Sequence, residues 1–95
     1  MRAKLKIKIL REGAKIPQHA TDGSAGMDLS SGADEEIVIP AGGVAKVPTG
    51  ISAECDRRDG VLLIFARSGL ATKHGVFLAN SVGVVDPDYR GEIIV

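Results

Sequence analysis

Residues 36–66 read EIVIPAGGVAKVPTGISAECDRRDGVLLIFA, and this stretch decides the fold class. Short apolar runs alternate with turns rich in Gly, Pro or charge, and we expect strands at residues 36–40, 44–48, 51–55 and 61–66. Many short strands separated by such turns are typical of an all-β barrel or sandwich. The last run is unbroken, which predicts a strand buried on both faces.

The N-terminal segment is predicted to add a further strand and a loop. Residues 4–9, KLKIKI, alternate strictly, which predicts a half-buried strand with a solvated lysine face. Residues 12–24 hold Gly13 and Pro17 and lack a sustained apolar period, so we expect a loop there. His19 in this loop has no second His or Cys at ligand spacing, and we expect it at the surface.

The only segment that favours a helix follows residue 66. Ser68 is a candidate N-cap, and Gly75 is placed to end about two helical turns. A strand that enters a helix through Arg67-Ser68-Gly69 can bind an anion, because backbone N–H groups point outward there and arginine offers a bidentate fork. An ordinary turn with a capping serine is the alternative, and these residues alone do not separate the two.

Residues 83–92, GVVDPDYRGE, lie between the apolar residues 75–79 and 93–95. This arrangement predicts a β-hairpin with a polar tip, in which Pro87 presets φ for a turn. A turn does not require a carboxylate, a phenol and an arginine in this order. We therefore infer that the tip carries chemistry.

Composition excludes several classes of protein. A chain of 95 residues makes one domain, and its 44% hydrophobic content with a mean hydropathy of +0.12 predicts apolar surface for an oligomer interface. The 12 basic and 12 acidic residues balance, which argues against a nucleic-acid binder. Cys55 is the only cysteine, so we expect no internal disulfide and a reduced, cytoplasmic setting. No apolar run is long enough to span a membrane.

Residues 25–29, AGMDL, place Asp28 between two large apolar residues, either in a short strand with an outward acid or at the lip of a site. Together with residues 66–71, ARSGLA, and 83–92, this segment resembles the first three signature motifs of the trimeric dUTPases in order and spacing. The third motif is a near-consensus match over its ten positions, and the likeness extends over nearly the whole chain.

The resemblance implies a fold, an assembly and a reaction. The fold is a jelly-roll-like distorted β-barrel, the dUTPase-like β-clip, with one short helix after the second motif. The assembly is a homotrimer with sites at the subunit interfaces, and no nucleic-acid or membrane partner is expected. The reaction is the Mg²⁺-dependent hydrolysis of dUTP to dUMP and pyrophosphate, which removes dUTP in nucleotide metabolism.

The resemblance also assigns the groups that handle phosphate and metal. Asp86 would be the general base that deprotonates the water attacking the α-phosphorus, since a carboxylate within hydrogen-bond reach can accept that proton. Arg67, Ser68 and Gly69 would hold the phosphates. Asp28 would hold magnesium through coordinated waters, which suits an ion that keeps waters and binds substrate phosphates.

A second set of residues would recognise the base and the sugar. Asn80 lies where the family places a uracil-reading asparagine, and its amide both donates and accepts. Gly83, Val84 and Val85 would line the slot and offer backbone groups to the base. Tyr89 would stack under the deoxyribose and exclude a 2′-hydroxyl. A turn residue at Asn80 and a core aromatic at Tyr89 are the alternatives.

Several positions lie outside these roles. We expect Asp88, Arg90 and Glu92 in structural ion pairs. Met27 and Ala66 stand where the family usually has an aromatic residue and a proline, and neither change removes a functional group.

The family continues through a fourth motif with Arg and Gln and a fifth, Gly-rich arm with a phenylalanine, and the sequence contains neither. The apolar end at residues 93–95 carries no turn signal. We therefore expect a single dUTPase-like domain over residues 1–95, truncated at its C-terminus, with weak or no turnover unless the missing part is supplied.

Two alternatives stay open. The first is a non-catalytic fragment of this family that binds nucleotide or partner subunits. The second is a relative of the dCTP deaminases, which share the fold but differ around the second motif and the hairpin tip. Residues 67–69 and 88–91 favour the diphosphatase.

Overall fold

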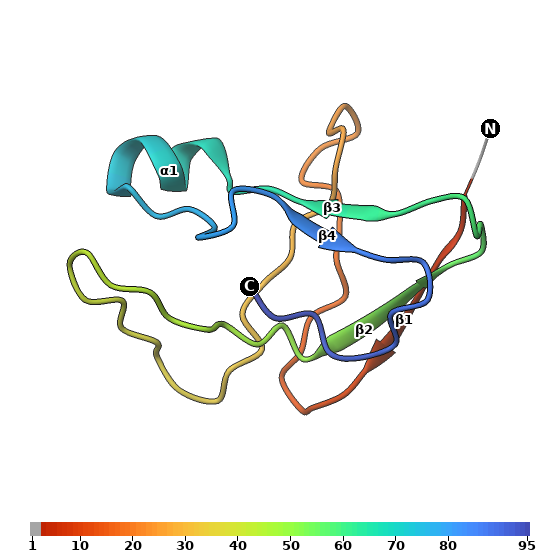
Figure 1. Ribbon diagram of the computed structural model, residues 1–95, viewed down its shortest axis with the longest axis horizontal. Helices are drawn as coiled ribbons and strands as arrows, with labels where there is room; N and C mark the ends of the chain where they lie inside the picture. The colour runs from red at the N-terminus through yellow and green to blue at the C-terminus, as the bar shows by residue number, and fades with distance from the viewer. Residues whose placement is uncertain (1–2) are drawn as a thin grey trace.

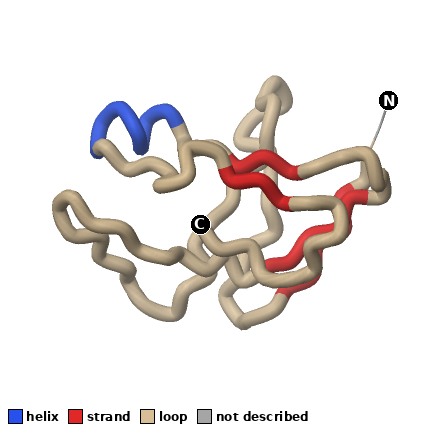
Figure 2. Tube along the Cα trace, viewed as in Figure 1, coloured by secondary structure: helices blue, strands red, loops and turns tan. Residues whose placement is uncertain are grey.

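The computed structural model describes residues 3–95 as a mostly β protein with one short helix. In chain order the elements are β1 (Leu5–Ile9), β2 (Ile51–Cys55), β3 (Leu62–Ile64), α1 (Ser68–His74) and β4 (Gly83–Val85). The strands form two two-stranded antiparallel sheets, β1–β2 and β3–β4, which lie one above the other in Figure 1. Loops make up most of the remaining chain (Figure 2). The β class is as predicted, but no closed barrel forms within residues 3–95.

The β1–β2 sheet confirms the strand predicted from strict alternation. Lys6 and Lys8 are exposed, whereas Leu5 and Ile7 are half-buried. The register pairs Ile7 with Ala53, whose side chain is buried. One face of this sheet therefore contributes to the core while the lysines stay in water.

The core lies between the two sheets and is small. It is centred on the buried Ala53, Val85 and Ile93. Five half-buried apolar side chains pack against these three: Leu5, Ile7, Leu29, Leu62 and Ile64. Because the cluster draws on β1, β2, β3 and β4, it packs the two sheets against each other.

The prediction that β3 is buried on both faces is wrong. Leu62 and Ile64 pack against the core, but Leu63 is 52% exposed and Phe65, just beyond the strand, is 63% exposed. Val84, paired with Leu63 in the β3–β4 register, is 61% exposed. Only one side of this ribbon is covered, so its other face is an uncovered apolar surface.

The strands predicted at residues 36–40 and 44–48 are also wrong. Both segments lie in a loop that extends away from the sheets (yellow to yellow-green in Figure 1), and Val38 and Val44 are among its most exposed side chains. The turn between them does form, with the Gly43 N–H donating to the Pro40 carbonyl at 2.8 Å. An apolar run becomes a strand only where a partner strand is in reach. Within residues 3–95 no strand pairs with residues 36–40, and only the end of the second run pairs, Val47 with Val95 and Pro48 with Ile94.

The predicted hairpin between residues 75–79 and 93–95 does not form. Residues 93–95 instead run beside residues 47–51, where Val47 and Val95 exchange N–H···O bonds of 2.7 and 2.9 Å. The Ile93 N–H donates to the Ile51 carbonyl at 2.9 Å. Residues 93–95 thus pair with a segment more than 40 residues away. Local turn signals do not predict such a distant pairing.

The helix forms where it was predicted, but its start differs. Arg67, not Ser68, occupies the N-cap position, and no side-chain cap hydrogen bond is made. Gly75 ends the helix as predicted, in the left-handed region at φ 64°, with its N–H donating to the Ala71 carbonyl at 3.0 Å. A glycine adopts this conformation without the steric cost that a side chain adds.

Candidate functional site

An ion pair joins the first and second motif segments. Arg67 Nη1 donates to Asp28 Oδ1 at 2.9 Å; the Arg67 side chain is exposed and the Asp28 side chain is half-buried. Asp28 is held by its backbone, because its N–H donates to the Gln18 carbonyl at 2.8 Å and the two residues form an isolated bridge. Arg67 is positioned by the end of β3 and the start of α1. Two segments 39 residues apart therefore meet at an acid and a guanidinium.

Asp28 also lines a shallow hollow of about 520 Å³. The hollow is bounded by Lys15, Ile16, Gln18, His19, Ala20, Asp28 and Ser30. Among these residues only Asp28 was predicted from the sequence to belong to a site, because the others lie in no motif.

His19 is exposed at this hollow, as expected, and its Nδ1 lies 2.8 Å from the Gly26 carbonyl oxygen. A carbonyl oxygen only accepts, so Nδ1 carries the hydrogen in this contact. This hydrogen bond also ties the loop before the first motif to the motif itself.

Ser68 and Gly69 lie exposed at the first turn of α1. The Ser68 carbonyl accepts a hydrogen bond of 2.8 Å from the Thr72 hydroxyl, and the Ser68 hydroxyl does not cap the helix. A Cβ built on Gly69 would meet nothing within 4 Å. Open space therefore lies beside Gly69, and Arg67 supplies the positive charge at this end of the short helix.

The third motif segment begins in β4 and continues as a tight loop. Asp86 is exposed, and its carbonyl accepts the Tyr89 N–H at 3.1 Å across the turn that contains Pro87. Tyr89 is 44% exposed, so it is not a core aromatic. Its hydroxyl donates to the Glu92 carbonyl at 2.8 Å, which fixes the ring against its own loop.

The residues predicted to recognise the base divide into an exposed and a buried group. Asn80 is exposed in a turn where Ser81 has φ 65°. The Val84 side chain points out of the sheet, whereas Gly83 and Val85 are buried. A Cβ at Gly83 would lie 3.2 Å from the Ile64 Cβ, so a glycine suits this close approach of β4 to β3.

One chain does not bring Asp86 together with Arg67 and Ser68. In the antiparallel β3–β4 ribbon, Ile64 pairs with Gly83 and Leu62 pairs with Val85. Arg67 follows β3 at one end of the ribbon, and Asp86 follows β4 at the opposite end. Figure 1 shows β3 leading to α1 and β4 running away from it.

Comparison with known proteins identifies the family to which these segments belong. The dUTPase family model matches residues 12–95. The chain belongs to the dUTPase family.

Curated relatives agree with this assignment. A deoxyuridine 5'-triphosphate nucleotidohydrolase of Desulfitobacterium hafniense is 49% identical over 94 residues, covering 97% of this chain and 62% of that protein. The corresponding protein of Paraburkholderia phytofirmans is 41% identical over 95 residues, covering 100% of this chain and 64% of that protein. The chain thus spans less than two thirds of the length of these dUTPase relatives.

The residues present suit a magnesium ion of the kind that dUTPases are expected to use. Among residues 3–95, no group of three or more His, Cys, Asp or Glu side chains could hold a metal ion alone. Within residues 3–95, Arg67 binds Asp28 through Oδ1 and no hydrogen bond is made to Oδ2, and Gln18 and Ser30 line the same hollow. Magnesium prefers such oxygen ligands and commonly keeps waters beside one or two carboxylates. The fit is therefore to a hydrated ion that also binds phosphate.

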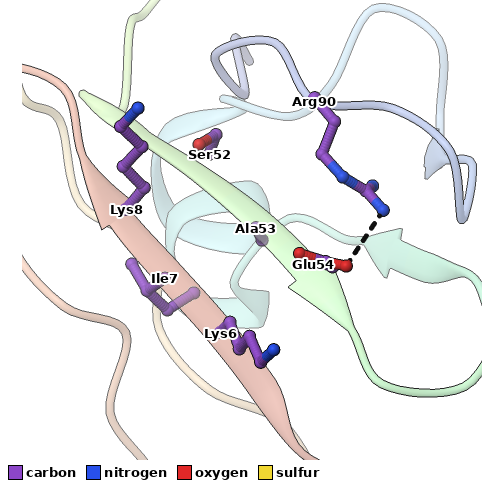
Figure 3. Close-up of a pocket in the computed structure, with 7 residues that line it drawn as sticks. All are labelled: Lys6, Ile7, Lys8, Ser52, Ala53, Glu54 and Arg90. Atoms are coloured by element: carbon purple, nitrogen blue, oxygen red, sulfur yellow. Dashed lines mark ion pairs between the residues drawn. The ribbon is translucent and has the colours of Figure 1, made fainter.

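Two ion pairs brace the loop of the dUTPase third motif. Arg90 Nη2 lies 3.3 Å from Glu54 Oε1 (Figure 3), and Arg11 Nη2 lies 3.1 Å from Glu92 Oε1. Arg90 and Glu92 thus form the structural ion pairs expected of them, whereas Asp88 forms none with residues 3–95. Sequence reasoning missed Arg11, because it lies 81 residues from its partner and in no motif.

A second hollow, of about 240 Å³, lies on the lysine face of the β1–β2 sheet beneath Arg90 (Figure 3). Lys6, Lys8 and Glu54 line it, and the lysine face is solvated as predicted. No helix within residues 3–95 is both long and apolar enough to cross a membrane.

Proposed function

We propose that this chain carries the first three site segments of a dUTP diphosphatase, which hydrolyses dUTP to dUMP and pyrophosphate. Family membership supports the reaction class, and the relatives bear the name of the nucleotidohydrolase. The observation that carries the proposal is the Arg67–Asp28 pair, because it unites a phosphate-binding cation and a metal-binding acid at a polar hollow.

Arg67, Ser68 and Gly69 hold the phosphates in this proposal. One guanidinium nitrogen of Arg67 is occupied by Asp28, which leaves its other N–H donors for phosphate oxygens. The open space beside Gly69 supports close approach of a ligand. The Asp28 carboxylate holds magnesium through water, and when bound the ion neutralises charge on the phosphate oxygens.

Asp86 acts as the general base. Its carboxylate accepts a proton from water as the water oxygen forms a bond to the α-phosphorus. The bond from that phosphorus to the α,β-bridging oxygen breaks, and pyrophosphate leaves with the electron pair. Exposure of Asp86 at the turn after β4 supports access to water. The rest of catalysis is positioning and charge neutralisation.

Base and sugar are recognised by the turn and loop that flank β4. The Asn80 amide and the backbone of Gly83, Val84 and Val85 read uracil, while the Tyr89 ring stacks under the deoxyribose. Asn80 and Tyr89 are both exposed, which supports contact with a ligand. The buried Val85 side chain contributes packing rather than contact.

The active species is a homotrimer in which neighbouring copies complete each site. Within one chain Asp86 and Arg67 leave the β3–β4 ribbon at opposite ends, so a second copy must bring them together. The uncovered apolar face of Leu63, Phe65 and Val84 supports association with other copies. This trimer would carry the distorted jelly-roll barrel that the dUTPase family implies, in a cytoplasmic setting.

The proposal is tested by pyrophosphate release from dUTP with Mg²⁺. Release from the wild-type chain, reduced about 10²- to 10⁴-fold in Asp86→Asn, supports the role of the base. If Asp86→Asn releases pyrophosphate at the wild-type rate, the assignment of the base is wrong.

A second candidate, binding without turnover, is favoured by the separation of Asp86 from Arg67 within one chain. Calorimetry with a non-hydrolysable dUTP analogue separates the two candidates. Binding with no pyrophosphate release identifies the non-catalytic module, and release identifies the enzyme. Ammonia release from dCTP would instead identify a deaminase, which the names of the relatives disfavour.

A further inference from the structure

The Glu92 carboxylate is held by partners from two distant parts of the chain. Its Oε1 lies 3.1 Å from Arg11 Nη2, and its Oε2 accepts the Gly50 backbone N–H at 2.8 Å. The Glu92 side chain is only 19% exposed. Both oxygens are therefore used, in a partly buried place where charge-assisted hydrogen bonds are stronger than on an open surface. We call Arg11, Gly50 and Glu92 the clamp.

The surroundings of the clamp are tightly packed. Gly50 has φ 74°, and a Cβ there would lie 2.7 Å from the Arg11 Cγ. Next to Glu92, the carbonyl of the buried Ile93 accepts the hydroxyl of Thr49 at 2.6 Å. The backbone of Glu92 is consequently fixed on one side by its carboxylate and on the other by the residue that follows it.

Tyr89 takes its position from this fixed backbone. The Tyr89 hydroxyl donates to the Glu92 carbonyl at 2.8 Å. The ring packs on Gly91, where a Cβ would lie 2.7 Å from the ring carbon that bears the hydroxyl. The orientation of the ring is thus set by Glu92 and Gly91, and the clamp sets the position of Glu92.

We propose that Arg11 and Glu92 are positioning residues that hold Tyr89 and thereby set discrimination between deoxyribose and ribose nucleotides. The proposal rests on the proposed function, which places Tyr89 under the sugar. A ring that excludes a 2′-hydroxyl by contact must be held closely, because misplacement by 1 Å can cost about 10²-fold in a catalytic step. When the clamp is lost, the ring can move and admit the hydroxyl.

The Arg90–Glu54 pair provides a matched control. It braces the same loop, but its side chains are 53% and 46% exposed. Arg90 Nη1 donates to the backbone carbonyls of Tyr89 at 3.1 Å and Pro87 at 2.9 Å, whereas the Tyr89 hydroxyl is held by Glu92. Glu54→Gln removes one carboxylate charge from an ion pair on this loop, as Glu92→Gln does. The proposal requires the two substitutions to differ in their effect on sugar discrimination.

The first measurement needs no ligand. Tyr89 is the only tyrosine and the chain has no tryptophan, so intrinsic fluorescence reports on this ring alone. We expect acrylamide to quench Tyr89 more strongly in Arg11→Met and Glu92→Gln than in the wild type or Glu54→Gln, with recovery in Arg11→Lys. Unchanged quenching in both clamp variants would overturn the positioning role.

The second measurement is the ratio of Kd values for non-hydrolysable UTP and dUTP analogues, obtained by calorimetry. We expect this ratio to fall about tenfold or more in Arg11→Met, which leaves the Glu92–Gly50 bond intact, and to be restored in Arg11→Lys. Equal weakening of both analogues would show a merely structural role and overturn the proposal. A wild-type chain with no preference for the deoxy analogue would overturn the proposed function, while quenching would still decide the positioning role.

Discussion

The contacts of the Asp28 side chain are set by the tertiary structure and not by its neighbours in sequence. Its neighbours in sequence allow a short strand with an outward acid, but no strand forms at residues 25–29, and the backbone of Asp28 makes only one isolated bridge, with Gln18. The side chain nevertheless meets Arg67 and lines a hollow. An exposed ion pair of this kind contributes about 0–1 kcal/mol, so stability alone gives little reason for it.

We predict that Asp28→Asn lowers the affinity for Mg²⁺ without unfolding the chain. Loss of the carboxylate removes the anionic ligand at the hollow, and the Mg²⁺ concentration that half-saturates binding of the dUTP analogue should rise about tenfold or more. Calorimetry over a series of Mg²⁺ concentrations measures it. Asp22→Asn is the control, because Asp22 is an exposed acid in the preceding loop. Equal effects of the two changes would contradict the assignment.

The charged turn of residues 56–60 yields a prediction about pH. Arg57 donates to both carboxylate oxygens of Asp59, at 3.0 and 2.7 Å, and these hydrogen bonds lower the pKa of Asp59 below its ordinary value. Since the folded pKa is lower than the unfolded one, the stabilisation exists above the unfolded pKa and is lost as pH falls through the folded pKa. Carboxyl NMR titration should give Asp59 a low midpoint, which returns to the ordinary value in Arg57→Gln.

At the scale of secondary structure, the two ends of α1 differ in how far the local sequence determines them. The end of the helix was predictable, because a glycine in the left-handed region at Gly75 is a strong local signal. The start was not, because Ser68 entered the helix and Arg67 took the cap position. The extended Arg67 continues from β3, so the geometry of the incoming strand decided where the helix begins.

The two glycines of this helix should respond oppositely to alanine. Gly75→Ala forces a side chain into the left-handed region and should lower the free energy of unfolding by about 1–2 kcal/mol. Gly69→Ala adds a methyl group that meets nothing within 4 Å, and should raise it by up to about 1 kcal/mol. Urea denaturation measures both. A loss of stability in Gly69→Ala would mean that residue 69 is packed by another copy.

At the scale of the whole molecule, the β3–β4 ribbon is only half covered. Its inner face contributes Leu62, Ile64 and Val85 to the core, and its outer face exposes Leu63 and Val84 side by side. Adjacent exposed apolar side chains on one sheet face are typical of an interface. The same ribbon separates Asp86 from Arg67. In the proposed trimer, the uncovered face of this ribbon would therefore bring in the copy that supplies the missing half of the site.

We predict that Leu63→Glu reduces the native mass of the assembly, because a charge in a buried apolar interface is unfavourable. Native mass spectrometry should detect trimer for the wild type and mainly monomer for the variant. Val38→Glu is the control, since Val38 is 73% exposed but lies in the loop away from both sheets. A trimer that survives Leu63→Glu but not Val38→Glu would show that the copies meet through the loop.

The sequence by itself determined the elements that depend on neighbouring residues: the alternating strand β1, the glycine that ends α1, the surface position of His19 and the family to which the three motif segments belong. These features follow from periodicity, turn chemistry and the order of residues within about ten positions.

Only the tertiary structure decided which segments pair. It formed no strand from residues 36–40 or 44–48, joined residues 93–95 to 47–51, and brought Arg11 to Glu92 and Asp28 to Arg67. Pairing over 39 to 81 residues depends on competition among all segments for a small core, and that competition leaves no local mark in the sequence.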